Sequence, residues 1–186
     1  FFFIPDDEAP ESMITPTSCD WTTSITVSVS FTDRLGSGFK HYEYAITESE
    51  EEPTDWSTIS SKQTDTITIN QEGILYLHIR ATDNAGNVSE DRVEGPYKID
   101  RSGPTPTLSY HPTEWVNDKV YIHWEFVDDK CGYKQVRLPD GTVTTESSGD
   151  YLVTNNDTYT FVAYDNLDNS STVSQTITNI DKTPPE

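Results

Sequence analysis

The stretch Ile25-Thr26-Val27-Ser28-Val29-Ser30-Phe31 alternates apolar side chains with small polar ones. The alternation returns in Val120-Tyr121-Ile122-His123-Trp124-Glu125-Phe126, where the intervening residues are polar or amphipathic. A period of two puts every second side chain on the same face of a β-strand. Each stretch therefore predicts a strand with one buried face. Each is followed two residues later by an aspartate, Asp33 or Asp128, so the two stretches indicate two copies of one unit.

Further landmarks repeat in the same order on both sides of these strands. Asp6, Asp100 and Asp181 each lie four residues before a proline, and Trp21 and Trp115 each lie eleven residues after one. Towards the end of each copy, Asp83-Asn84-Ala85-Gly86-Asn87 corresponds to Asp165-Asn166-Leu167-Asp168-Asn169. The shared order and spacing predict two tandem domains, residues 10–100 and 101–182. We interpret residues 1–9 as the end of a preceding repeat or a linker, and residues 183–186 as the start of the next linker.

The turn residues divide the first copy into short segments, as an all-β domain requires. They predict seven strands, near Met13–Thr15, Ile25–Asp33, Phe39–Thr47, Trp56–Ile59, Asp65–Ile69, Ile74–Asp83 and Arg92–Ile99. Seven alternating strands in one copy favour an antiparallel β-sandwich of the immunoglobulin or fibronectin type III kind. The expected core consists of apolar residues at alternate positions: Ile25, Val27, Val29, Phe31, Tyr42, Tyr44, Leu77 and Ile79 in the first copy, and Val120, Ile122, Trp124, Phe126, Val136, Leu138, Tyr159 and Phe161 in the second.

Composition and charge exclude several classes of function. The chain has 32 Asp and Glu against 12 Lys and Arg, a formal net charge of −20. Nucleic-acid binding needs clustered cations, so this balance argues against nucleic acid and against an anionic membrane surface as partners. No apolar stretch approaches the ~18 residues of a spanning helix. With 4 Trp, 10 Tyr and 7 Phe, the chain has too many aromatic residues for a disordered tail.

The end of the first copy resembles a known family. The run Ala81-Thr82-Asp83-Asn84-Ala85-Gly86-Asn87-Val88-Ser89, followed by Tyr97-Lys98-Ile99-Asp100 and Pro104, is similar to the closing pattern of bacterial immunoglobulin-like repeats of large surface proteins. Ile180-Asp181-Lys182-Thr183-Pro184-Pro185 repeats that ending, whereas Leu167 and Asp168 depart from the usual Ala and Gly. The resemblance implies an extracellular location on the bacterial cell surface, tandem arrays, and adhesive or spacer roles.

We therefore expect a non-catalytic spacer or adhesion stalk, because no catalytic constellation is visible. The expected partners are neighbouring repeats of the same chain, together with a host or cell-surface protein or glycan. The alternative is a ligand-binding or carbohydrate-binding accessory module of an extracellular adhesin or enzyme. Trp56, beside the acidic run Glu48–Glu52, is the candidate ligand-binding residue for that alternative. The acidic run itself is interpreted as a solvated loop.

Acidic and amide side chains from several loops are expected at one end of each sandwich. Carboxylate and amide oxygens are ligands for Ca²⁺, which takes six to eight of them. The candidate ligands are Asp33, Asp83, Asn84 and Asn87 in the first copy. In the second copy they are Asp100, from the linker that leads into it, with Asp128, Asp129, Asp165, Asp168 and Asn169. The competing interpretation is plain turn chemistry, in which Asn and Asp cap the loop and Gly supplies a positive φ. The sequence contains no dense D-x-D-x-D loop, so both interpretations stay open.

Three further residue types were considered for a disulfide, for packing or for metal binding: the cysteines, the repeated tryptophans and the histidines. Cys19 and Cys131 occupy non-equivalent loops that would face the domain junction, where an interdomain disulfide is geometrically feasible if the Cα atoms come within ~7 Å. Trp21 and Trp115 recur at one register and are expected to pack. The pattern directs His41, His78 and His123 outwards, and no histidine has a partner at zinc-ligand spacing.

Overall fold

The computed structural model describes residues 5–34, 36–56 and 58–184. The chain forms two compact units, with the boundary between Asp100 and Arg101. The interpretation of residues 1–4 as part of a preceding strand falls outside the described residues, as do residues 185–186. The described residues include no helix long and apolar enough to cross a membrane.

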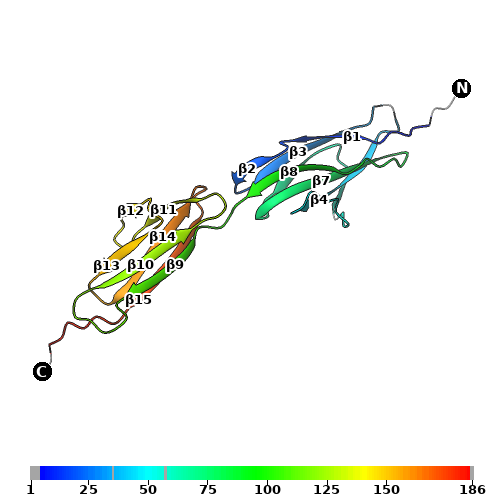
Figure 1. Ribbon diagram of the computed structural model, residues 1–186. Helices are drawn as coiled ribbons and strands as arrows, with labels where there is room; N and C mark the ends of the chain where they lie inside the picture. The colour runs from blue at the N-terminus through cyan, green and yellow to red at the C-terminus, as the bar shows by residue number, and fades with distance from the viewer. Residues whose placement is uncertain (1–4, 35, 57, 185–186) are drawn as a thin grey trace. The chain divides into compact units, whose positions relative to one another are not determined.

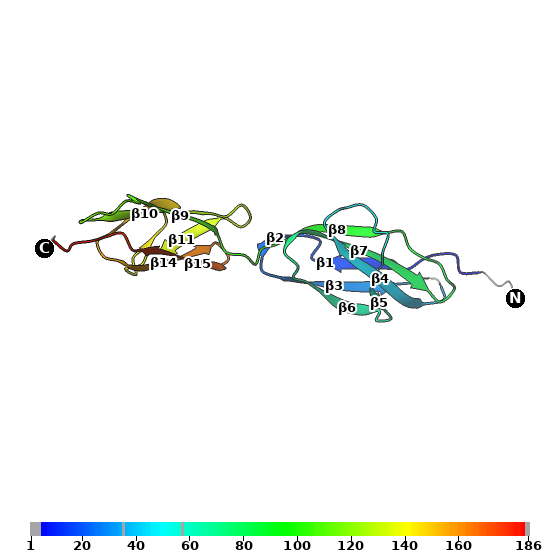
Figure 2. The same cartoon turned by 90° about the horizontal axis from the view of Figure 1, so that it is seen from below.

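The first unit is a two-layer β-sandwich. One sheet has the order β1-β3-β6 and the other β2-β8-β7-β4-β5, and the two layers are visible in Figure 2. The predicted strand Phe39–Thr47 is β4, and the predicted strand Arg92–Ile99 is β8. The full set is β1 (Glu11–Thr15), β2 (Cys19–Thr22), β3 (Ile25–Thr32), β4 (Phe39–Thr47), β5 (Thr58–Ser60), β6 (Thr64–Ile69), β7 (Gly73–Asp83) and β8 (Arg92–Ile99).

The second unit repeats the arrangement with fewer strands. Its sheets have the orders β13-β10-β9 and β12-β11-β14-β15, and Figure 1 shows β10 among its neighbours. The strands are β9 (Thr105–His111), β10 (Val120–Val127), β11 (Tyr133–Arg137), β12 (Val143–Thr144), β13 (Ser148–Val153), β14 (Asp157–Asp165) and β15 (Ser170–Ile177). These observations confirm the all-β sandwich fold for both copies.

One strand of the first unit, β2, was not predicted. Because of it, the strands of this unit do not all pair antiparallel. The short strand β2 contains Cys19, which the sequence placed in a loop, and β2 pairs in parallel with β8. In the second unit an isolated parallel bridge joins Val116 to Ile180. In the first unit the chain thus leaves one sheet after β1 and joins the other sheet through β2. A four-residue strand without clean alternation carries no periodic signal, so sequence patterning misses it.

The predicted core residues fill the space between the sheets. In the first unit the alternate residues of β3 are buried, and Phe31 stacks on Phe39 and Tyr42 at ring-centroid distances of 5.0 and 4.6 Å. Tyr44 and Ile25 pack against this core while only partly buried. The aromatic stack supplies a large contact area where an antibody domain would carry a disulfide.

In the second unit, Trp124 belongs to the buried core and is 4% exposed. Its ring approaches Gly149 so closely that a Cβ at that position would lie 2.8 Å from Cζ2 of Trp124. Phe126 lies 6.2 Å from it between ring centroids, and Phe161 is fully buried in the same cluster. Leu138 and Tyr159 pack at the margin of this cluster while only partly buried. The alternation along β10 therefore predicted the inward face correctly.

The prediction that His78 faces solvent is wrong, because its side chain is 0% exposed. Alternation does place it on the outer face of its sheet, opposite Ala45, but the segment after β4 covers it there. Nε2 of His78 lies 2.9 Å from the carbonyl oxygen of Ser49, and Nδ1 lies 2.7 Å from Oδ2 of Asp91. The acidic run Glu48–Glu52 does expose its carboxylates as expected, while its backbone is anchored on His78.

Substituting Trp124→Ala tests the assignment of the core. We expect a loss of about 3–5 kcal/mol in the free energy of unfolding of the second unit, because a large cavity would open beside Gly149. Urea unfolding of the intact chain measures it. Trp115→Ala is the matched control, because Trp115 is 72% exposed and the loss of its side chain should cost less than ~0.5 kcal/mol. Equal losses in the two variants would contradict the assignment.

Candidate functional site

The loop after β7 is organised by one buried carboxylate. Asp83 is 0% exposed, and its Oδ1 accepts the backbone N–H groups of Gly86 and Asn87 at 2.6 and 2.8 Å. Its Oδ2 accepts a hydrogen bond from Nδ2 of Asn87 at 2.7 Å. The loop folds back around this carboxylate, and Gly86 adopts a φ of 101°, a region that side-chain-bearing residues rarely enter.

The second unit builds the same loop after β14. Asp165 is also 0% exposed, and its Oδ1 accepts the N–H groups of Leu167 and Asn169 at 2.9 and 2.8 Å. Its Oδ2 accepts a hydrogen bond from Nδ2 of Asn169 at 2.7 Å. Where the first unit has a glycine, Asp168 takes a φ of 65°, and its Oδ1 pairs with Nζ of Lys134 at 2.5 Å. Asp168 is therefore an ion-pair partner on the surface.

A second loop is tied to the first in both units. Asn84 donates through Nδ2 to the carbonyl oxygens of Ser37 and Gly38 at 3.0 and 2.9 Å. Asp33 accepts the N–H of Gly38 at 2.7 Å. The corresponding contacts in the second unit run from Asn166 to the Cys131 carbonyl at 2.9 Å, and from the Gly132 N–H to Asp128 at 2.8 Å. The repeated polar residues thus hold two loops together.

Three carboxylates meet at this end of the first unit. Asp6, Asp33 and Asp83 each offer an oxygen, and the three oxygens lie within 4.8 Å of one another. Asp6 comes from the segment that leads into β1, and its Oδ2 accepts the N–H of Ser37 at 2.6 Å. Nδ2 of Asn87 lies 3.1 Å from the backbone oxygen of Asp6 and therefore links the incoming segment to the loop.

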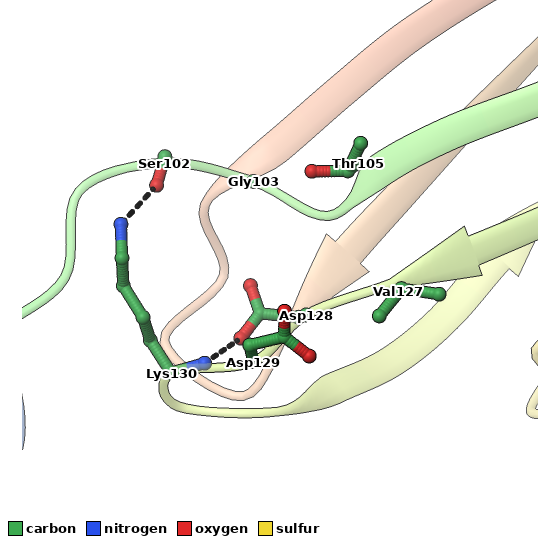
Figure 3. Close-up of a pocket in the computed structure, with 7 residues that line it drawn as sticks. All are labelled: Ser102, Gly103, Thr105, Val127, Asp128, Asp129 and Lys130. Atoms are coloured by element: carbon green, nitrogen blue, oxygen red, sulfur yellow. Dashed lines mark hydrogen bonds between the residues drawn. The ribbon is translucent and has the colours of Figure 1, made fainter.

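The second unit brings Asp128, Asp165 and the thiol of Cys131 within 4.8 Å of one another. Beside Asp128 lies a hollow, drawn in Figure 3 and lined by Ser102, Gly103, Thr105, Val127, Asp128, Asp129 and Lys130. Nζ of Lys130 donates to Oγ of Ser102 at 3.0 Å, and its backbone N–H donates to Oδ1 of Asp128 at 3.0 Å. The position of Cys131 in this cluster was not predicted, although its spacing of three residues from Asp128 in one loop was a usable signal.

The remaining predicted ligands make further contacts, and their role as ligands stays a prediction. Asn84, Asn87 and Asn169 direct their amide nitrogens at protein acceptors, so at these contacts they act as donors and not as oxygen ligands. Asp129 lines the hollow with an exposed side chain. Asp100 ends the first unit, where its N–H donates to the carbonyl oxygen of Thr22 at 2.9 Å.

Electrostatics at Asp83 favour the carboxylate form. Burial by itself raises the pKa of this carboxyl, but hydrogen bonds from the side chain and backbone of Asn87, and from the backbone of Gly86 and Ala85, lower it more strongly. The net direction is a pKa below the ordinary value of 3.8. Asp83 is therefore negatively charged at neutral pH, which suits both the loop and a bound cation.

The tryptophans fall in different environments. One face of the Trp56 ring is covered by the guanidinium of Arg80, 4.3 Å from the ring centroid, and Glu43 holds that guanidinium at 2.7 Å. Trp21 is partly buried in β2. The expectation that Trp115 packs like its counterpart is wrong, because the residue is 72% exposed. A shared register along the chain did not ensure shared burial.

The two cysteines lie within separate units. Cys19 is partly buried against the core of the first unit, whereas Cys131 lies in the loop between β10 and β11. Their pairing stays a prediction.

Comparison with known proteins places the chain among similar structures without assigning a family. No family model and no curated protein matches it. The fibronectin(III)-like modules of CbhA from Clostridium thermocellum are 18% identical, with 92% of this chain and 95% of that chain covered and a TM-score of 0.37. Dimeric latent PorU from Porphyromonas gingivalis is 10% identical over 95% of this chain, with a TM-score of 0.33, and the match spans 24% of PorU. Similarities with such low sequence identities and TM-scores do not indicate the activity or the ligands of this chain.

Replacing Asp83 with Asn tests the role of the buried carboxylate. A group whose pKa is lowered in the folded state stabilises above its unfolded pKa, and the benefit disappears as pH falls through the folded value. We therefore expect Asp83→Asn to lower the melting temperature of the first unit by several degrees at pH 7, and the deficit to shrink as the pH falls below 3.8. Calorimetry across this range measures it.

Asp20→Asn is the matched control, because the Asp20 carboxylate is fully exposed. It should leave the melting temperature nearly unchanged at every pH. A deficit in Asp83→Asn that stays constant into acid would contradict the assigned charge.

Proposed function

We propose that this chain supplies tandem, non-catalytic modules of a secreted or surface-anchored bacterial protein, where they act as spacers in an adhesive stalk. The observation that carries the proposal is the set of hydrogen bonds that the carboxylates of Asp83 and Asp165 accept. In each unit this buried carboxylate accepts hydrogen bonds from residues of its own loop, which supports a structural role over a reactive one. A catalytic acid or base needs access to substrate and a pKa matched to its task. Asp83 is fully buried and hydrogen-bonded and its pKa is lowered, so it has neither.

An extracellular location is part of the same proposal. Residues 1–100 carry 19 acidic and 6 basic side chains, and residues 101–186 carry 13 and 6, giving −13 and −7. Both units thus share the negative charge, which favours solubility and works against non-specific binding to polyanions. The resemblance of Ala81–Ser89 to the closing pattern of bacterial surface repeats supports this location.

The spacer role can be tested by pulling the intact chain in a force spectrometer. We expect two separate unfolding events, each extending the chain by roughly 250–300 Å, because each unit would unfold as its own sandwich. Trp124→Ala should lower the force of one event and leave the other unchanged. A single event, or extension without resistance, would contradict a spacer made of two units that each resist force.

Calcium binding at the Asp6–Asp33–Asp83 cluster is the second element of the proposal. Three carboxylates from three segments bring together oxygen ligands of the kind that Ca²⁺ prefers. An ionised carboxylate has about four acceptor positions, so it can bind a cation in addition to the N–H groups that it already accepts. A cation there would tie the incoming segment to both loops of the first unit. For the second unit, Asp100 is the counterpart of Asp6 in the repeat and is kept as a ligand on that correspondence alone.

Melting in calcium tests this element. If the site binds Ca²⁺ with a Kd near 1 mM, as extracellular modules do, 10 mM Ca²⁺ should add about 1.4 kcal/mol of stability, which raises the melting temperature of a unit of this size by roughly 6–11 °C. Asp33→Asn should abolish the increase, whereas Glu50→Gln, in the exposed acidic run, should preserve it. Magnesium at the same concentration controls for ionic strength. An unchanged melting temperature would exclude the calcium site and leave the spacer role standing.

A further inference from the structure

The strongest unassigned feature is the hollow around Trp115 in the loop between β9 and β10. Trp115, Val116, Asn117 and Asp181 line it. Trp115 is 72% exposed. Tryptophan is mostly buried in folded proteins, so an indole left this open adds little to stability and has its binding surface available.

The loop that presents Trp115 is firmly held. Asn179 is 7% exposed and donates through Nδ2 to the carbonyl oxygens of Pro112 and Glu114, at 2.9 and 2.7 Å. On the other side of Trp115, the Val116 N–H donates to the Asn179 carbonyl at 2.9 Å, and the Val116 carbonyl accepts from the Asp181 N–H at 2.8 Å. The backbone is therefore fixed immediately before and after the exposed indole, which lowers the entropic cost of binding there.

The polar groups of the hollow complement the aromatic face. Asn117 is exposed and offers an amide donor and acceptor. Asp181 accepts the N–H of Thr183 at 2.9 Å. Backbone and side-chain hydrogen bonds from Thr183 lower its pKa, so the group is an ionised acceptor at neutral pH. A flat apolar ring beside a carboxylate and an amide matches a pyranose, which has one C–H face and a rim of hydroxyl groups.

The surrounding charge selects among sugars. Glu114 and Asp118 flank Trp115 along the chain, and the second unit carries −7 overall. Repulsion therefore disfavours uronic-acid and sulfated glycans. We propose that the Trp115 hollow binds a neutral oligosaccharide, with the sugar ring stacked on the indole and its hydroxyl groups hydrogen-bonded to Asn117 and Asp181. This goes beyond the spacer role, and it moves the carbohydrate hypothesis away from Trp56, where Arg80 covers one face of the ring.

Affinity electrophoresis of the intact chain in gels containing β-glucan, xyloglucan, galactomannan or yeast mannan tests the proposal. We expect at least one of these neutral polysaccharides to retard the chain. Trp115→Ala should weaken that retardation roughly tenfold or more, as truncation of a central aromatic anchor does. Trp56→Ala is the matched control and should migrate like the parent chain.

A second variant distinguishes a sugar site from a cation site, because an indole beside carboxylates also attracts cations. Asp181→Asn keeps a hydrogen-bond acceptor but removes the charge, so sugar binding should survive within a few-fold and stay insensitive to 0.5 M NaCl. No retardation in any gel, or retention of binding by Trp115→Ala, would overturn the proposal. Binding to an oligolysine peptide that Asp181→Asn and salt abolish, without binding to polysaccharide, would overturn it in favour of a basic partner.

Discussion

The burial of one carboxylate in each sandwich, Asp83 in the first and Asp165 in the second, constrains the loop that surrounds it. A buried charge is costly unless hydrogen bonds replace the lost water. In both units two backbone N–H groups and one asparagine amide do so. The loop must therefore curl around the carboxylate, and the curl requires a positive φ at one residue. In the first unit the opposing loop is hydrogen-bonded to this loop through Asn84, and the segment that contains Asp6 is hydrogen-bonded to it through Asn87.

This constraint also explains why the most conspicuous polar motif of the chain need not be a reactive site. Its polar groups already form hydrogen bonds within the protein, as the donor roles of Asn84 and Asn87 show. What a cation could add is a further link between segments that meet there. Binding of a larger molecule is better supported at Trp115, whose indole is open while the backbone on both sides is held. The two surfaces involve different chemistry and are independently testable.

Much of the fold could be predicted because alternation along a strand is a local property. The inward face of β10 and the bounds of β4 and β8 follow from patterning and turn residues. The burial of a side chain was less predictable where it depends on whether another segment covers the outer face of the sheet. His78 occupies an outward register and is nevertheless buried, because the segment carrying Ser49 crosses over it. Trp115 repeats the register of Trp21 and is open. Neither outcome is encoded in the residue's own neighbourhood.

By itself the sequence determined that the chain is two copies of an acidic β-sandwich, since periodicity, turn residues and repeated spacing are read along one dimension. Tertiary structure alone decided how the polar residues are used. Asp6 and Asp83 are 77 positions apart in the chain, and only folding brings their oxygens within reach of one cation. Likewise, only the structure showed that asparagine amides donate at the loop. The physical reason is that hydrogen-bond partners and exposure depend on distances between segments that sequence order does not specify.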